Sequence, residues 1–169
     1  MKRIRVVILL SFVLLSKSLF ATVQRSDILI VNGDTLRIRR SFPLEQYFEQ
    51  KGERTFGGVT IRALYSALWR GYVATWKLEN DSLFLIHINI IEDNSVGVKD
   101  EFGSDRVFAE WVNGNIQGEE VRVHRRRYVF FWWHYYRYEK RFVFENGKVR
   151  ATLTAAIRAN RFEWLRQNQ

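Results

Sequence analysis

The sequence predicts a mainly β protein (α+β), in which an antiparallel meander of hairpins forms a strongly twisted sheet or a partly closed barrel. Runs of β-prone residues alternate apolar and polar side chains, as half-buried strands do. Three Asn-Gly dipeptides and one Asn-Asp dipeptide stand between such runs and favour tight turns. One or two short helices complete the predicted fold, and the absence of Cys rules out disulfides.

The first predicted hairpin joins residues 28–31 to residues 35–39 through Asn32-Gly33. Asn-Gly is suited to this turn because both residues tolerate a positive φ. Pro43 then ends the extended chain, since its fixed φ fits the first position of a helix. Leu44, Tyr47 and Phe48 follow, so we expect a short helix over residues 43–50.

The central hairpin has the clearest alternation in the chain. Residues 72–78 place Tyr72, Ala74 and Trp76 on one face, and Asn80-Asp81 turns them into the apolar run 82–90. The Gly-containing stretch before this hairpin, 53–60, is expected to be a loop. An acidic stretch after it, 91–106, is expected to be a long connection with a helical turn.

Two more hairpins and a helix are expected in the C-terminal half. The hairpins join residues 107–112 to 115–123 around Asn113-Gly114, and residues 140–144 to 148–154 around Asn146-Gly147. The apolar spacing after them predicts a helix over residues 155–166.

Residues 1–21 have the features of a secretory signal peptide. A basic start precedes the apolar run 6–15, and Ala21 stands at a suitable cleavage site. A membrane anchor is the alternative, but a ten-residue helix rises only about 15 Å, which is half of a bilayer core. We therefore expect cleavage near Ala21, which leaves residues 22–169 as a single secreted or periplasmic β-rich domain.

The net charge depends on that cleavage. The formal charge of the full chain is +9, and residues 1–21 contain four basic and no acidic residues, so residues 22–169 carry +5. Much of the basicity belongs to the targeting segment, and we expect no nucleic-acid partner.

Several segments of the chain resemble a family of uncharacterised secreted proteins of Gram-negative bacteria, many of them from Bacteroidetes. The most specific is the motif from Trp69 to Trp76, and the others are residues 43–48, 108–114 and 144–149. The resemblance implies secretion and a β-rich fold, and it implies no activity. Residues 125–138 are more basic and more aromatic here than in that family.

Residues 128–138 contain eight aromatic side chains in eleven positions, preceded by Arg125-Arg126-Arg127. As a strand, this segment presents rings on both faces, so we expect one face to be core. The other face would be a platform for a flat ligand such as a sugar, with Arg available to bind an anion. The alternative is a central strand that is covered on both faces.

We predict a non-catalytic binding or interaction module that uses an aromatic and Arg surface. Its partner would be a cell-envelope glycan or another envelope protein. The alternatives are a hydrolase of an envelope polymer with an unrecognised carboxylate site, and an envelope-associated protein that contacts anionic lipid head groups at the membrane periphery. The candidate binding residues are Trp69, Arg70, Trp76, Arg126, Trp132, Trp133, His134 and Tyr136.

No catalytic residue, metal site or cofactor is predicted. The three histidines, of which His87 is expected to face the core, show no metal-ligand spacing. The acidic residues show no spacing typical of a catalytic pair. Arg70 is expected to pair with a carboxylate such as Glu110, either in an Arg–aromatic corner that closes the core or in a ligand clamp.

Overall fold

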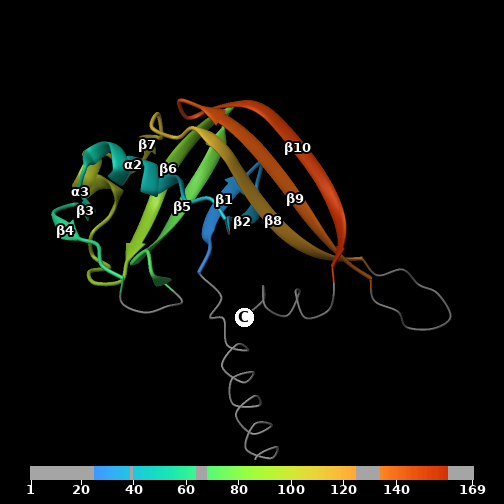
Figure 1. Cartoon of the computed structure of the whole chain (residues 1–169), viewed down its shortest axis with the longest axis horizontal. Coiled ribbons are helices and arrows are strands. Elements are labelled where there is room, and N and C mark those ends of the chain that lie inside the picture. Colours follow the sequence, from blue (N-terminus) through green and yellow to red (C-terminus); the bar gives the residue numbers. More distant parts are fainter. Residues whose placement is uncertain (1–24, 39, 64–67, 125–133, 160–169) are drawn as a thin grey trace, which may run out of the picture.

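The computed structural model describes residues 25–38, 40–63, 68–124 and 134–159. Within this part of the chain lie ten strands and two helices (Figure 1). In chain order they are β1 (Asp27–Val31), β2 (Asp34–Ile38), α2 (Pro43–Lys51), β3 (Thr55–Phe56), β4 (Val59–Thr60), β5 (Tyr72–Glu79), β6 (Ser82–Ile90), α3 (Val98–Phe102), β7 (Val107–Phe108), β8 (Gly114–His124), β9 (His134–Glu145) and β10 (Lys148–Ala159).

The main sheet closes on itself as a seven-stranded barrel, which confirms the predicted fold class. Its strand order is β10-β9-β8-β2-β1-β5-β6, and β7 is attached to the outer side of β6. The seam is the antiparallel contact of β10 with β6, where Lys148 lies opposite Ser82. Strands β3 and β4 form a separate two-stranded hairpin in place of the predicted loop.

One strand pair departs from a simple meander of hairpins. Strands β1 and β5 are parallel, with Leu29 opposite Trp76. A parallel pair needs a long connection, and here it contains β2, α2 and the β3–β4 hairpin. Strand β1 therefore lies between β2 and β5, with hydrogen-bonding partners on both sides.

The barrel interior follows the predicted alternation along β5, where Tyr72, Ala74 and Trp76 are fully buried. The prediction that His87 faces the core is wrong, because His87 is exposed. A β-bulge is the reason: Thr75 lies opposite His87, but the next residue, Trp76, lies opposite Leu85. The extra residue shifts the inward phase of β6, so its core side chains are Leu83 and Leu85 before the bulge and Ile88 and Ile90 after it.

The predicted hairpin around Asn113-Gly114 is also wrong. Strand β7 pairs with β6, whereas β8 pairs with β9 and β2. Between β7 and β8 the chain makes a buried turn in which the Val112 N–H donates to the Ala109 carbonyl. The ring of Trp111 in this turn stacks on Phe102, with centroids 5.6 Å apart. Packing of these apolar residues takes precedence over the local turn signal.

The helix expected from residue 155 is contradicted as far as the structure describes it. Strand β10 continues to Ala159, and each residue from Ala151 onward has a partner in β9. Pairing with a long neighbouring strand overrides the weak local preference for a helix. Residues 160–166 of the expected helix lie outside the described residues.

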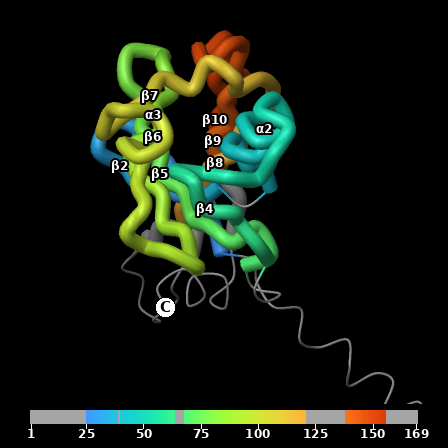
Figure 2. The backbone as a smooth tube through the Cα atoms, turned by 90° about the vertical axis from the view of Figure 1, so that its left-hand side faces the viewer, coloured from blue at the N-terminus to red at the C-terminus, as the bar shows by residue number. Residues whose placement is uncertain are grey.

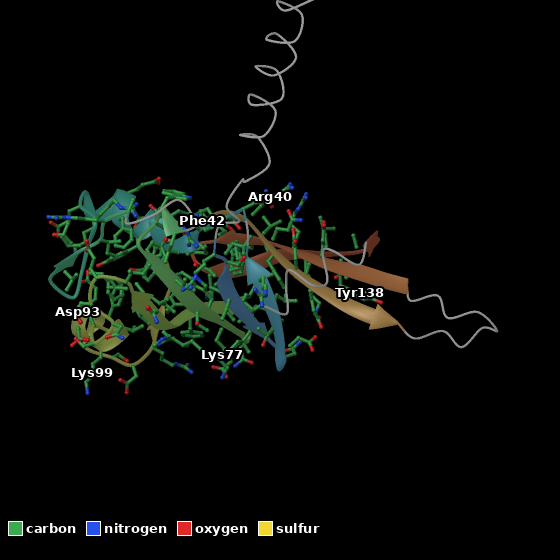
Figure 3. The ribbon with its side chains drawn as sticks, turned by 90° about the horizontal axis from the view of Figure 1, so that it is seen from below. Arg40, Phe42, Lys77, Asp93, Lys99 and Tyr138 are labelled. Atoms are coloured by element: carbon green, nitrogen blue, oxygen red, sulfur yellow. The ribbon has the colours of Figure 1, made fainter. Side chains whose placement is uncertain are left out.

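Strands β8, β9 and β10 are much longer than the five-residue strands β1 and β2. They run past these short strands as a curved three-stranded sheet, which we call the arm (Figure 1). Helices α2 and α3 and the β3–β4 hairpin gather at the other end of the barrel, which faces the viewer in Figure 2. Tyr138 lies on the arm, far from Asp93 and Lys99 beside the helices (Figure 3).

Candidate functional site

A buried ion pair joins the first strand of the barrel to the corner before β5. Arg70 and Asp27 are both fully buried, and the Arg70 Nη1 lies 2.7 Å from the Asp27 Oδ1. Asp27 also accepts hydrogen bonds from the Ala74 amide at 3.2 Å and from the Trp76 indole at 3.3 Å. The other guanidinium nitrogen, Nη2, donates to the Arg25 carbonyl at 2.6 Å.

This arrangement is the Arg–aromatic corner, and it corrects two of the candidate binding residues. The Arg70 guanidinium lies 3.9 Å from the ring centre of Phe42. Its ion-pair partner is Asp27, whereas the expected partner Glu110 is exposed on the surface. Trp76 is fully buried beneath it. Arg70 and Trp76 are therefore core residues with no surface to offer a ligand.

Trp69 differs from its neighbour Arg70, because 48% of its surface is exposed. Its ring meets Phe42 edge to face, with ring centres 6.1 Å apart. Phe42 is in turn covered by the Arg70 guanidinium. The predicted candidate Trp69 is thus an accessible ring that packs, through Phe42, against the buried ion pair.

The remaining candidates lie in the sequence between the end of β8 and the first residues of β9. Arg126, Trp132 and Trp133 lie outside the described residues, in the connection between β8 and β9. His134 and Tyr136 are in β9, where they lie opposite His124 and Arg122 of β8. The sheet register thus brings together two histidines that are separated in the sequence.

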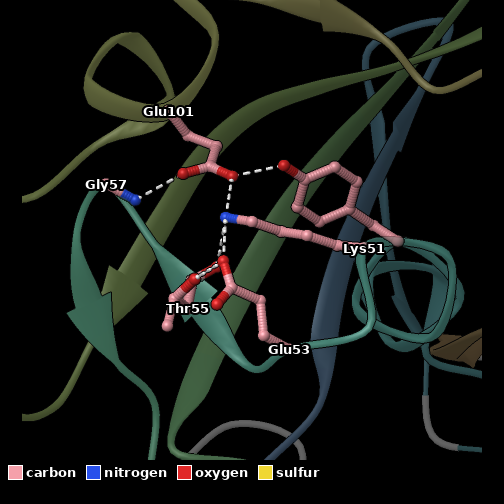
Figure 4. Close-up of polar contacts among 6 residues, drawn as sticks. Lys51, Glu53, Thr55, Gly57 and Glu101 are labelled. Carbon is pink, nitrogen blue, oxygen red and sulfur yellow. Dashed lines mark hydrogen bonds and ion pairs between the residues drawn. The ribbon is translucent and has the colours of Figure 1, made fainter.

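A second polar network connects the helices to the β3–β4 hairpin (Figure 4). One oxygen of Glu101, in α3, accepts hydrogen bonds from the Tyr47 hydroxyl and from the Lys51 ammonium at 2.6 Å. Its other oxygen accepts the Gly57 amide at 2.7 Å. Lys51 also donates to the Thr55 carbonyl at 3.1 Å. The Glu101 carboxylate therefore links α3 to α2 and to the β3–β4 hairpin.

The network predicts a specific loss of stability in acid. Burial acts to raise the pKa of Glu101, but hydrogen bonds from Lys51, Tyr47 and Gly57 outweigh it, so the pKa lies below its usual value. A carboxyl whose pKa is lowered by folding stabilises the protein above its unfolded pKa, near 4.5, and this contribution disappears as the pH falls through the folded pKa. The difference in urea midpoint between the wild type and Glu101→Gln should therefore be largest near pH 6 and shrink toward pH 3. A difference that stays constant with pH would contradict this assignment.

The outer face of the arm contains a shallow cleft of about 230 Å³. Leu153 has 60% of its surface exposed, the largest exposed fraction among the large apolar side chains that the structure describes. Arg141 lies opposite Leu153 in the register, is exposed, and has no ion-pair partner among the described residues. Beside them the Gln117 amide donates to Glu139 at 3.0 Å. The lining residues are Gln117, Glu139, Arg141, Leu153, Thr154 and Ala155.

This cleft was not predicted from the sequence. Its residues come from three strands, and Ala155 had been placed in a helix. The missed signal is the alternation itself: residues 139, 141 and 143 form one face of β9, and residues 151, 153 and 155 form the same face of β10. Both Arg141 and Leu153 lie in predicted strands, but the β-bulge between Val149 and Ala151 sets the register that places them opposite each other.

No protein-family model, no curated protein and no solved structure matches this chain. Within the described ranges, no cluster of three His, Asp or Glu side chains is arranged to hold a metal ion. None of the helices in those ranges is long and apolar enough to span a bilayer. The geometry of the site therefore carries the functional argument.

Proposed function

We propose that the chain is an exported, non-catalytic binding module and that the outer face of its arm contacts the ligand. The observation that supports this most is the cleft in which the exposed Arg141 lies beside the exposed Leu153. The Arg141 guanidinium, which has no ion-pair partner among the described residues, can pair with an anionic group of a ligand. The exposed Leu153 beside it offers an apolar contact to the same ligand.

The chemistry of the cleft suits a cell-envelope glycan or another envelope protein. The planar guanidinium of Arg141 can bind a carboxylate or phosphate through two parallel hydrogen bonds. Glu139 and Gln117 supply acceptors and donors for hydroxyl groups, and Leu153 supplies the apolar contact. Peptidoglycan fragments carry carboxylates, hydroxyl groups and methyl groups, so they are the first ligands to test.

The aromatic residues of the β8–β9 connection would extend this surface. Arg126, Trp132 and Trp133 belong to the stretch between His124 and His134 in the sequence, which lies outside the described residues. Rings stack on flat sugar faces, and they would complement the single cation of the cleft. Trp69 stands on a different corner and is proposed as a second contact.

Export remains part of the proposal, and it rests on the signal-peptide pattern and on the resemblance to secreted proteins of Gram-negative bacteria. Residues 1–21 lie outside the described residues, and the first described strand begins at Asp27. Cleavage near Ala21 would therefore leave the barrel intact. N-terminal sequencing of the native product should return Thr22, and a product that retains Met1 would contradict export.

The binding surface is tested by titrating residues 22–169 with soluble peptidoglycan fragments while following Trp fluorescence. Arg141→Ala should weaken binding about tenfold or more, since an Arg–carboxylate pair is worth about 1.5–3 kcal/mol. Arg106→Ala is the matched control, because Arg106 is an exposed cation paired with Glu79, away from the cleft. Equal affinities of the two variants would contradict the proposed surface.

Two further readouts from the same mixtures separate the alternatives. Release of hydrolysis products would overturn the non-catalytic part of the proposal in favour of the hydrolase. Retention on anionic lipid vesicles that is lost at high salt, with no response to the glycan fragments, would instead favour contact with lipid head groups.

A further inference from the structure

Asn-Gly dipeptides are chemically labile, and the chain has three of them, at Asn32-Gly33, Asn113-Gly114 and Asn146-Gly147. The glycine nitrogen can attack the side-chain amide carbon of the preceding Asn, because Gly has no Cβ to hinder the approach. Asn is for this reason counted among the thermolabile residues. The attack requires that both groups move freely, so the contacts of each dipeptide in the folded chain decide its rate.

The side chain of Asn113 is held at both ends of its amide group. Its Oδ1 accepts a hydrogen bond from the Asn146 amide at 2.9 Å, and its Nδ2 donates to the Trp111 carbonyl at 3.3 Å. The backbone amide of Asn113 also donates to the Gln46 side chain at 2.8 Å. Attack on the amide carbon of Asn113 therefore requires several of these contacts to break together.

At Asn146-Gly147 the attacking nitrogen is held. The Gly147 amide donates to the Val112 carbonyl, and the Gly147 carbonyl accepts the Leu83 amide, both at 2.9 Å. Gly147 is also buried. The Gly147 nitrogen is therefore released only when the hydrogen bonds at the barrel seam open.

Asn32-Gly33 has a similar turn conformation without these restraints. The φ angles are 51° at Asn32 and 85° at Gly33, against 48° at Asn146 and 73° at Gly147. Residues 32 and 33 are both exposed, just beyond the last pair of β1 and β2. Within the described ranges, neither the Asn32 side chain nor the Gly33 nitrogen makes a hydrogen bond, and a Cβ built on Gly33 meets no atom within 4 Å. This turn can rearrange without disturbing a packed part of the molecule.

We propose that Asn32 is a site of spontaneous deamidation, in which the Gly33 nitrogen attacks the Asn32 Cγ. The Gly33 nitrogen loses its proton as the N–Cγ bond closes a cyclic imide, and the side-chain nitrogen leaves as ammonia. Water then opens the imide. Opening at the side-chain carbonyl gives Asp, and opening at the main-chain carbonyl gives isoaspartate, in which the chain continues through Cγ. Either product adds one negative charge to the turn, and the inference is independent of the ligand proposed above.

The two products should affect the hairpin differently. Asp-Gly suits a two-residue turn as Asn-Gly does, so the Asp form should keep the pairing of β1 with β2. Isoaspartate adds one carbon to the main chain of the turn, which disturbs the pairing of Val31 with Asp34. The Asp34 Oδ2 also lies 3.5 Å from the Lys140 Nζ in β9. The isoaspartate form should therefore loosen the contact of this turn with the arm as well.

The three sites are compared in one experiment, because trypsin places them in separate peptides: Asn32 in 26–37, Asn113 in 107–122 and Asn146 in 142–148. Folded residues 22–169 are incubated at mildly alkaline pH, and mass spectrometry with fragmentation follows the loss of each amide. We expect Asn32 to deamidate at least about fivefold faster than the other two, the factor that one hydrogen bond of typical strength supplies. In urea, where the chain is unfolded, the three rates should be similar. If Asn113 or Asn146 reacts as fast as Asn32 in the folded chain, the proposal is wrong. It is also wrong if Asn32 keeps its amide in the folded chain while the unfolded chain loses it.

The effect on the hairpin is measured on the separated products. Anion exchange separates the aged protein into its amide, Asp and isoaspartate forms, with Asn32→Asp as the marker for the second. Asn32→Asp should unfold at the wild-type temperature, and the isoaspartate form should unfold at a lower one. An isoaspartate form as stable as Asn32→Asp would overturn the predicted effect on the pairing of β1 with β2.

Discussion

Arg70→Met should lower the free energy of unfolding by about 3–5 kcal/mol, which is the usual cost of removing one partner of a buried ion pair. The Asp27 carboxylate would keep only the Ala74 amide and the Trp76 indole as donors. Burial acts to raise the pKa of Asp27, and Arg70 acts in the opposite direction, so without the guanidinium the carboxyl would take up a proton more readily. Urea unfolding of residues 22–169, followed by Trp fluorescence, measures the loss.

Two variants show whether the loss comes from the uncompensated charge. Arg106→Met removes an exposed cation that pairs with Glu79, and it should change stability little. Replacing both partners, Asp27→Leu with Arg70→Met, should recover part of the loss because no buried charge is then left alone. If Arg70→Met lowers the free energy of unfolding no more than Arg106→Met does, the Asp27–Arg70 ion pair does not stabilise the corner before β5.

The second large effect is expected at the barrel seam, where Gly147→Ala should cost more than Gly33→Ala. Both glycines follow Asn in a tight turn and have positive φ, +73° at Gly147 and +85° at Gly33. At Gly33 an added Cβ meets nothing within 4 Å, so only the backbone cost of about 1–2 kcal/mol applies. At Gly147 the added Cβ would lie 2.5 Å from the Ala109 carbonyl oxygen, so the backbone must also move.

A backbone shift at Gly147 would weaken the hydrogen bonds that close the barrel. The Gly147 amide donates to the Val112 carbonyl, and the Gly147 carbonyl accepts the Leu83 amide, both at 2.9 Å. Hydrogen exchange of the Leu83 amide should therefore accelerate in Gly147→Ala and stay unchanged in Gly33→Ala. Equal losses of stability in the two variants would show that the seam tolerates a side chain.

The sequence predicted the parts of the fold that local patterns determine. The hairpins at Asn32-Gly33, Asn80-Asp81 and Asn146-Gly147 formed as expected, since each combines a turn dipeptide with alternating flanks. The misplaced features depend on contacts between distant residues. The bulge that turns His87 outward is set by pairing with β5, and the length of β10 is set by β9.

The site was less predictable for the same reason. Trp69 and Arg70 are adjacent in the sequence, yet one is half exposed and the other fully buried. What separates them is Asp27, which lies 43 residues away from Arg70 and has no local sign of being a core residue. The side chains of the arm cleft likewise gather only once β8, β9 and β10 are in register.

The central position of β1 has a consequence for how the chain reaches its native state. Any process that delivers the polypeptide N-terminus first exposes β1 long before β5, and the hairpin that seals the seam comes last. Until the last strands emerge, the barrel has no closed interior, and the Asp27 carboxylate remains hydrated. Closure of the barrel is therefore postponed until nearly the whole polypeptide has emerged, and such long-range pairing slows folding.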